Sequence, residues 1–256
     1  MSISDAQRTV LIEDRFQGLP ELAHGGYVAG LLASALGADG VEVRLRRPVP
    51  TGRPLTLERG PETSVAELLD GETLLAEAAP AAPTIEPPPP VSPLEAGAAA
   101  RRFLGHERHP APHCVVCGTE RAAGDGLRIF PGPVAGRRLV AAPWVPAAAE
   151  ADGEGRVGPE LVSAAFDCTQ LWALIAHAPP GTEDLVVTSG LELSLLRPVR
   201  AGQPHVLLGW PIGRQGRAWL AGAALFDLDG ELCASGRQRA AITSWGLPLG
   251  IGSRAA

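Results

Sequence analysis

The sequence predicts an α+β protein made of two tandem copies of one unit, in which an antiparallel sheet wraps around a long central helix. The main observation is an internal repeat: residues 41–54 read VEVRLRRPVPTGRP, and residues 191–204 read LELSLLRPVRAGQP. Seven of the fourteen aligned residues are identical, and each copy alternates like a strand before a corner that contains proline. Each copy also follows an apolar stretch of helical length, at residues 27–38 and 160–178.

Both predicted helices are apolar on nearly every side, which predicts that they are buried. The stretch Gly25–Ala38 has no charged residue, and Asp167 is the only carboxylate in the stretch Leu161–Thr182. A buried acid is destabilising unless it is paired, hydrogen-bonded or protonated. We therefore expect Asp167 to have a partner or a function.

A proline-rich segment at residues 80–93, PAAPTIEPPPPVSP, separates the two copies. Such a segment can continue neither a helix nor a central strand, so we expect a linker. Ser92 followed by Pro93 is typical of a helix start and predicts a short helix that runs to about Phe103. The chain is thus divided into a shortened first repeat at residues 1–79, a linker with a short helix at 80–111, and a second repeat at 112–256.

Composition excludes several classes of protein. With 256 residues, 45% hydrophobic and 20% charged, the chain can form a sizeable core and is neither disordered nor membrane-embedded. A net charge of -6 disfavours nucleic acid as a partner. Asp5 and Arg8 lie where a signal peptide would have its apolar stretch, so we expect a cytoplasmic protein without a membrane partner. Every basic residue is arginine, which excludes a lysine Schiff base.

Two motifs indicate a family. The first predicted helix opens with His24-Gly25-Gly26, and the second copy opens with the motif CVVCG at residues 114–118, followed by GLRI at 126–129. The first motif resembles the HGG of hotdog-fold acyl-CoA thioesterases, in the double-hotdog arrangement with two copies in one chain. The second is similar to the opening of many single-hotdog thioesterases related to the phenylacetate-pathway enzyme. The resemblance covers residues 16–60 and 112–243 and implies a double hotdog that hydrolyses acyl thioesters.

The resemblance further implies a single site shared by the two halves. In this family the catalytic acid lies on the central helix, nine residues after the motif histidine. Counting nine residues from His24 reaches Ala33, whereas Asp167 lies nine residues after Gly158. Because the helix start of one copy meets the acid of the other in hotdog pairs, the glycines of the first half would face Asp167. The opposite pairing would face Ala33 with Pro159, which has no N–H for an oxyanion.

The second half also resembles the C-terminal half of bacterial acyl-CoA thioesterase II, whose water-activating residues are Asp, Thr and Gln. By position these correspond to Asp167, Thr188 and Gln238, which we expect to be catalytic. The carboxylate would accept a proton from the attacking water, the hydroxyl and amide would orient that water, and backbone N–H groups at the helix start would stabilise the oxyanion. The residues that we expect to bind substrate are His24, Gly25, Gly26, Tyr27, Phe166 and Trp172.

We expect no metal and no organic cofactor. One cluster in the sequence contains enough ligands for a zinc ion: His106, His109, His113, Cys114 and Cys117. There is no second CxxC pair, however, and the motif coincides with a hotdog opening that generally needs no metal, so zinc is kept as an alternative only. Cys168 has no histidine base near it in the sequence, which disfavours a nucleophilic cysteine.

Other functions are weighed against hydrolysis of acyl-CoA. A degenerate hotdog could bind an acyl or other lipophilic ligand without cleaving it, and the loss of half of each motif favours this alternative. A hotdog hydratase pairs an acid with a histidine on one helix, but His177 lies ten residues after Asp167, too far for one site. Two interpretations remain for the arginines at positions 44, 46 and 47. They form a solvated strand surface, or they contact the phosphates of coenzyme A. A homodimer of double-hotdog units is compatible with the fold.

Overall fold

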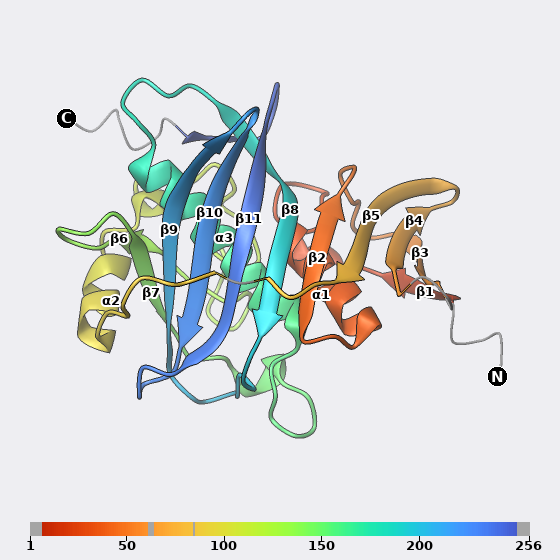
Figure 1. The fold of residues 1–256 in the computed structure, drawn as a ribbon, viewed down its shortest axis with the longest axis horizontal. Helices are drawn as coiled ribbons and strands as arrows, with labels where there is room; N and C mark the ends of the chain where they lie inside the picture. Colours follow the sequence, from red (N-terminus) through yellow and green to blue (C-terminus); the bar gives the residue numbers. More distant parts are fainter. Residues whose placement is uncertain (1–6, 61–63, 84, 250–256) are drawn as a thin grey trace.

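The computed structural model describes residues 7–60, 64–83 and 85–249, which form one large antiparallel sheet around two buried helices (Figure 1). The first half contains β1 (Gln7–Leu11), the 3-10 helix η2 (Asp14–Phe16), α1 (Gly25–Leu36), β2 (Gly40–Leu45), β3 (Pro54–Arg59), β4 (Ala66–Asp70) and β5 (Thr73–Pro80). It is followed by α2 (Pro93–Ala100) and η3 (Leu104–His106). The second half contains β6 (Gly132–Pro133), β7 (Val140–Trp144), η4 (Ala148–Glu150), α3 (Pro159–His177), β8 (Leu185–Leu195), β9 (His205–Gln215), β10 (Ala218–Phe226), β11 (Leu232–Thr243) and β12 (Leu247–Pro248).

The strand order confirms the predicted duplication. The sheet runs β1-β3-β4-β5-β2-β8-β11-β10-β9-β7-β6, and β12 pairs with β8. The order β1-β3-β4-β5-β2 in the first half matches β7-β9-β10-β11-β8 in the second, with the central helix preceding β2 or β8 in each case. Two α+β units therefore form one sheet, and the first half has its last strands, β4 and β5, although they are short.

The two copies join through the strands of the internal repeat. Strands β2 and β8 pair antiparallel at the centre of the sheet. Glu42 lies directly opposite Glu192, its own equivalent in the repeat, and Val41 lies opposite Leu193. Such a reciprocal register is expected where a local twofold axis relates two copies of one unit. The two sheets thus join edge to edge.

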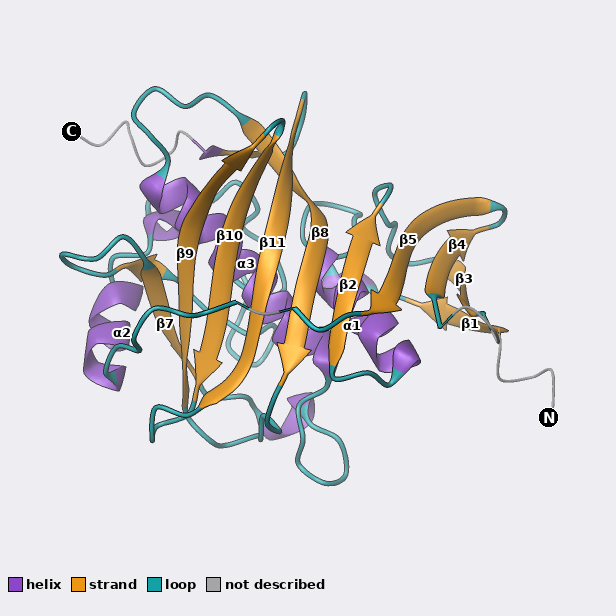
Figure 2. Cartoon of the chain, viewed as in Figure 1, coloured by secondary structure: helices purple, strands orange, loops and turns teal. Residues whose placement is uncertain are grey.

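Helices α1 and α3 pack directly against each other inside the curved sheet (Figure 2). A Cβ atom on Gly26 would lie 2.5 Å from the carbonyl oxygen of Ser163, and one on Gly30 would overlap the carbonyl oxygen of Pro159. The absence of side chains at these two positions permits the close approach of the helix backbones. In α3, 14 of the 19 residues are buried, so the helix is central, as its apolar sequence indicates. Gly37, with φ 63°, ends α1 in the left-handed conformation.

The proline-rich segment crosses the outer face of the sheet, opposite α3, and leads from β5 to α2 (Figure 1). Ser194 donates a hydrogen bond to the carbonyl oxygen of Pro83, and Ile85 lies over Gly222 of β10. Ser92 and Glu95 form a capping box at the start of α2. This segment therefore covers the outer face without adding a strand.

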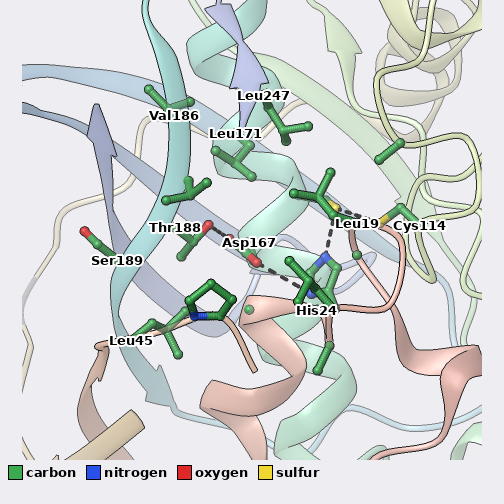
Figure 3. Close-up of a pocket in the computed structure, with 18 of the residues that line it drawn as sticks. Leu19, His24, Leu45, Cys114, Asp167, Leu171, Val186, Thr188, Ser189 and Leu247 are labelled. Carbon is green, nitrogen blue, oxygen red and sulfur yellow. Dashed lines mark hydrogen bonds and ion pairs between the residues drawn. The ribbon is translucent and has the colours of Figure 1, made fainter. Parts of the chain in front are cut away.

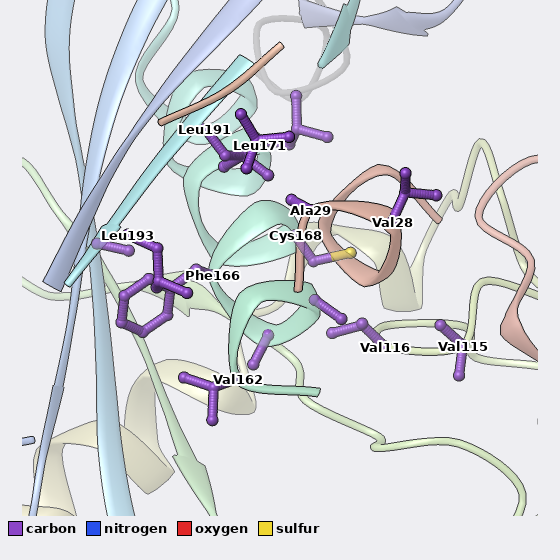
Figure 4. Packing of buried hydrophobic residues seen from close by; sticks show 14 of the residues in the cluster. Val28, Ala29, Val115, Val116, Val162, Phe166, Cys168, Leu171, Leu191 and Leu193 are labelled. Carbon is purple, nitrogen blue, oxygen red and sulfur yellow. The ribbon is translucent and has the colours of Figure 1, made fainter. Parts of the chain in front are cut away.

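The larger of two hydrophobic clusters connects the two halves (Figure 4). It includes side chains from α1, from the loop before β6, from α3 and from β8, among them Val28, Ala29, Val115, Val116, Phe166, Cys168, Leu171, Leu191 and Leu193. Burial of a large apolar side chain stabilises a fold by about 1.5–3 kcal/mol. The core thus fixes the position of each helix relative to the other. Within the described residues, every helix is too short or too polar to cross a bilayer.

Candidate functional site

A cavity of about 470 Å³ lies at the start of α1, between the two halves (Figure 3). Its apolar wall includes Leu19, Leu45, Leu171, Val186 and Leu247. Its polar groups include His24, Cys114, Asp167, Thr188 and Ser189. An apolar cavity of this size with a few convergent polar groups is typical of a small-molecule site.

Asp167 lies on the side of α3 that faces α1, and only 2% of its surface is exposed. Thr188 donates a hydrogen bond of 2.6 Å to its Oδ1 atom, and the Gln238 amide donates to the same oxygen. The backbone N–H of Gly26 donates to Oδ2 over 2.7 Å. These hydrogen bonds compensate for the burial of a carboxylate. The structure thus brings together the three residues that the sequence singles out, and it points the acid at the glycine turn.

Neighbouring strands position the threonine and the glutamine. Thr188 is on β8 and Gln238 on β11, which pair antiparallel with a bulge between Arg239 and Ala240. The amide of Gln238 lies 3.0 Å from the hydroxyl oxygen of Thr188, so both groups converge on one carboxylate oxygen. Asp167 and Thr188 line the cavity, whereas Gln238 is fully buried behind them. Gln238 therefore holds the carboxylate and the hydroxyl in place rather than facing the cavity.

The two glycines at the start of α1 differ in whether their backbone N–H is free to donate a hydrogen bond. The N–H of Gly26 is already bonded to Asp167. Gly25 lines the cavity, and its N–H has no acceptor within the described ranges. A Cβ atom on Gly25 would lie 3.2 Å from Oδ2 of Asp167, so the missing side chain keeps the space beside the acid open. Of the two N–H groups expected to stabilise an oxyanion, only that of Gly25 is free to do so.

Only three of the six residues expected to bind substrate line the cavity: His24, Gly25 and Trp172. The ring of Tyr27 instead stacks on Phe16 with centroids 4.2 Å apart, and Phe166 packs against Gly236 of β11. Tyr27 and Phe166, which we expect from the sequence to bind substrate, therefore do not line this cavity. An α-helix turns by about 100° per residue, so side chains one or two positions from a cavity-facing residue point elsewhere. Gly26 also lies outside the cavity wall.

Beside the acid lies a cluster of three thiols and one imidazole. The Sγ atom of Cys168 is 3.6 Å from that of Cys114, 3.3 Å from that of Cys117 and 3.1 Å from Nε2 of His24. All four side chains are buried, and the cysteines are free. Nδ1 of His24 lies 3.5 Å from Oδ2 of Asp167. The sequence gives no sign that Cys168 and His24 meet, because they are 144 residues apart.

The members of this cluster alter one another's pKa values. Hydrogen bonds from Cys117 and Cys168, and then the charge of His24, hold the pKa of Cys114 well below its usual range. Burial raises the pKa of Cys117 and Cys168. Burial lowers the pKa of His24, but the charge and hydrogen bond of Cys114 and the charge of Asp167 outweigh it, so that this pKa is raised. Negative charge is therefore favoured at Cys114 and positive charge at His24.

The zinc cluster considered from the sequence does not form. His113 is exposed and lies 3.3 Å from Glu120. His106 and His109 pack around the ring of Phe103. The thiols of the CxxC motif contact Cys168 instead.

Comparison with solved structures confirms the double hotdog fold. Over 95% of its length the chain is similar to the tesB protein of Mycobacterium avium subspecies paratuberculosis, at 12% identity over 95% of that chain, with a TM-score of 0.61. It is similar to the same extent to a proposed thioesterase from Novosphingobium aromaticivorans, at 13% identity over 98% of that chain, with a TM-score of 0.61. A protein of unknown function with the hot dog fold from Alicyclobacillus acidocaldarius matches 95% of each chain at 11% identity, with a TM-score of 0.53. No protein-family model and no curated protein matches the sequence.

Proposed function

We propose that this protein hydrolyses an acyl thioester with a water molecule activated by Asp167. One observation carries the proposal: a buried carboxylate, held by Thr188, Gln238 and the Gly26 N–H, borders an apolar cavity. The tesB protein and the proposed thioesterase with the same fold support the same reaction class. The proposal concerns one site per chain, formed by both halves.

The carboxylate has capacity left for water. A carboxylate offers about four lone-pair positions, and three are taken by the hydrogen bonds from Thr188, Gln238 and Gly26. Nδ1 of His24 lies 3.5 Å from Oδ2 but makes no hydrogen bond to it, so the fourth position is open. A water molecule in the cavity can donate to the remaining position. As the water oxygen bonds to the carbonyl carbon, Asp167 accepts its proton. The carbon–sulfur bond then breaks, and the leaving thiolate takes up that proton, so that the products are a carboxylic acid and a thiol.

Gly25 supplies the second part of the mechanism. Its free N–H lies at the start of α1, where the helix dipole is positive, and it can donate to the carbonyl oxygen as negative charge develops there. At the equivalent position of the second half, α3 starts with Pro159, which lacks an N–H. Ala33 stands where that pairing would need an acid. These two absences are why we assign the reaction to one site.

The substrate proposed is an acyl-CoA or a related thioester. Leucine and valine side chains line the cavity and suit an acyl chain. Arg46 and Arg47 also border it and are exposed, so their guanidinium groups can contact phosphates of the carrier. Arg46 lies beside Glu77, whereas Arg47 has no acidic partner among the described residues. Arg47 is thus the better candidate for a phosphate contact.

The same proposal retains the division of the chain into a first repeat at residues 1–79, a linker at 80–111 and a second repeat at 112–256. Strand β5 ends at Pro80 and the strands of the second half begin with β6 at Gly132, which supports this division. Residues 1–6 and 250–256, at the two ends of the repeats, lie outside the described residues.

The test is release of free thiol from acyl-CoAs of increasing chain length by wild-type protein and by the Asp167→Asn variant. We expect the variant to lose at least about 100-fold in kcat, since it keeps the shape of the side chain and removes the base. Glu160→Gln is the matched control, because Glu160 is on the same helix outside the cavity, and it should keep wild-type turnover. Equal turnover in Asp167→Asn would overturn the mechanism. Thermal stabilisation by acyl-CoA without any thiol release would instead support the alternative that this protein binds an acyl ligand and does not cleave it.

A further inference from the structure

We propose that His24, Cys114, Cys117 and Cys168 bind one zinc ion beside the acyl cavity. His24 caps the start of α1, the CxxC motif lies in the loop before β6, and Cys168 is on α3. The ligand atoms of His24, Cys114 and Cys168 all lie within 4.8 Å of one another, and Cys117 adjoins them through Cys168. This ligand set differs from the one considered from the sequence, and the proposal departs from the expectation of no metal.

The spacing of these atoms suits tetrahedral coordination. With Zn–S near 2.3 Å and Zn–N near 2.0–2.1 Å, neighbouring ligand atoms of a tetrahedral site are about 3.5–3.8 Å apart. The three separations from Sγ of Cys168 are 3.6, 3.3 and 3.1 Å. Sγ of Cys168 thus lies within about 0.5 Å of this spacing from each of the other three ligand atoms. Cys117 has to move toward the other ligands on metal binding, because it falls outside the set whose ligand atoms all lie within 4.8 Å of one another. A disulfide needs sulfur atoms about 2.05 Å apart. All three cysteines are free, and Sγ of Cys168 is well beyond that distance from both of the others.

A zinc ion also explains why polar groups gather at this buried position. His24 and the three thiols are each at most 4% exposed, and they come from three separate segments of the chain. An imidazole surrounded by weakly hydrogen-bonding thiols is poorly compensated for its loss of water. Thiolates and an imidazole in tetrahedral arrangement favour zinc over magnesium or calcium, which prefer oxygen ligands. Metal binding would release the thiol protons to solvent, and the metal–ligand bonds would compensate for the cost of burying these polar groups.

Two neighbouring groups lie close to the proposed ligands. The indole N–H of Trp172 donates to Sγ of Cys117 over 3.3 Å. The Nδ1 atom of His24 lies 3.5 Å from a carboxylate oxygen of Asp167, while its Nε2 atom faces the thiols. A histidine held between a carboxylate and a metal is a recurring arrangement of zinc sites.

The CxxC motif forms a tight backbone turn. The N–H of Gly118 donates to the carbonyl oxygen of Cys114 over 2.9 Å. A Cβ atom on Gly118 would lie 2.5 Å from that oxygen, so the turn requires glycine. With four protein ligands the site is closed and structural: it would tie the start of α1, from the first half, to α3 in the second half. The role in folding is independent of any thioester hydrolysis.

Zinc content of the full chain tests the proposal. Protein purified from zinc-supplemented cells should contain about one zinc per chain by mass spectrometry of the metal. Cys114→Ser, Cys168→Ser and His24→Ala should each lose most of it. Cys233→Ser is the matched control, since Cys233 is buried on β11 with its Sγ near the carbonyl oxygen of Glu231, outside the cluster, and it should keep full zinc content.

Cobalt substitution counts the thiolate ligands. We expect reduced wild-type protein to take up cobalt(II) and show a thiolate-to-cobalt charge-transfer band, and Cys117→Ser to lose about one third of its intensity. Less than about a tenth of an equivalent of zinc in wild-type protein, before and after reconstitution of the reduced form, would overturn the proposal. So would a disulfide within the cluster, seen as a mass lower by two hydrogens. Asp167→Asn should keep its zinc, so the two proposals fail separately.

Discussion

The first and second halves have the same strand order, but their central helices carry different parts of the site. Helix α1 has 12 residues, begins with two glycines and has Ala33 nine residues after His24. Helix α3 has 19 residues, begins with Pro159 and has Asp167 nine residues after Gly158. The second half also supplies the partners of the acid from its longer strands, which have 9–12 residues in β8 to β11, against 5–8 in β2 to β5.

This difference shows how duplication within one chain permits specialisation. In a symmetric pair each copy must contribute both a helix start and an acid. Once the copies are joined through β2 and β8, either helix can lose the part that its partner supplies. In the proposed mechanism the first half supplies the backbone N–H groups of the glycine turn, and the second half supplies the acid with its threonine and glutamine. Three sets of substitutions test this division, from the largest expected effect to the smallest.

Ala33→Asp restores an acid to the first half. Ala33 is 2% exposed, so the new carboxylate would be buried without the hydrogen bonds that hold Asp167. An unpaired buried charge destabilises a protein by about 3–5 kcal/mol, and we expect a loss of this size in urea unfolding. Ser34→Asp is the control on an exposed position of the same helix and should lose less than about 1 kcal/mol. A stable Ala33→Asp protein with doubled turnover would show that both halves can form a site.

Gly30→Ala tests the contact between the helices. A Cβ atom on Gly30 would overlap backbone atoms of Pro159 and Glu160, which cannot rotate away as a side chain can. We expect a loss of about 1–3 kcal/mol in the free energy of unfolding. In contrast, Gly97→Ala fills open space on α2 and should stabilise the protein by about 0.5–1 kcal/mol. Equal stability of the two variants would mean that α1 and α3 are not in close contact.

Thr188→Val and Gln238→Met test the support of the acid. Each removes a hydrogen bond to Oδ1 of Asp167 and conserves most of the side-chain volume. We expect kcat to fall about tenfold with KM unchanged, because Asp167 is held less firmly while the apolar wall is intact. Thr188→Ser retains the hydroxyl and should keep most of the turnover. A change in KM alone would instead assign these residues to substrate binding.

Local sequence patterns were sufficient for the architecture. Both central helices lie within two residues of the apolar stretches at 27–38 and 160–178, and the internal repeat marks the strands that join the two halves. The helices follow from the periodicity of apolar residues, and the joining strands follow from identity between the two copies. Both patterns can be read from short stretches of sequence. The convergence of Asp167, Thr188 and Gln238 was also expected, but from the resemblance to a family and not from their spacing.

The sequence by itself determined the duplicated α+β fold, the burial of its helices and a lone acid in need of partners. Only the tertiary structure decided which side chains face the cavity, because a rotation of about 100° per residue separates Phe166 from Asp167. It also decided that the Gly26 N–H is used by the acid and that His24 meets three cysteines. Those contacts join segments as far as 144 residues apart, and packing rather than local spacing sets such distances.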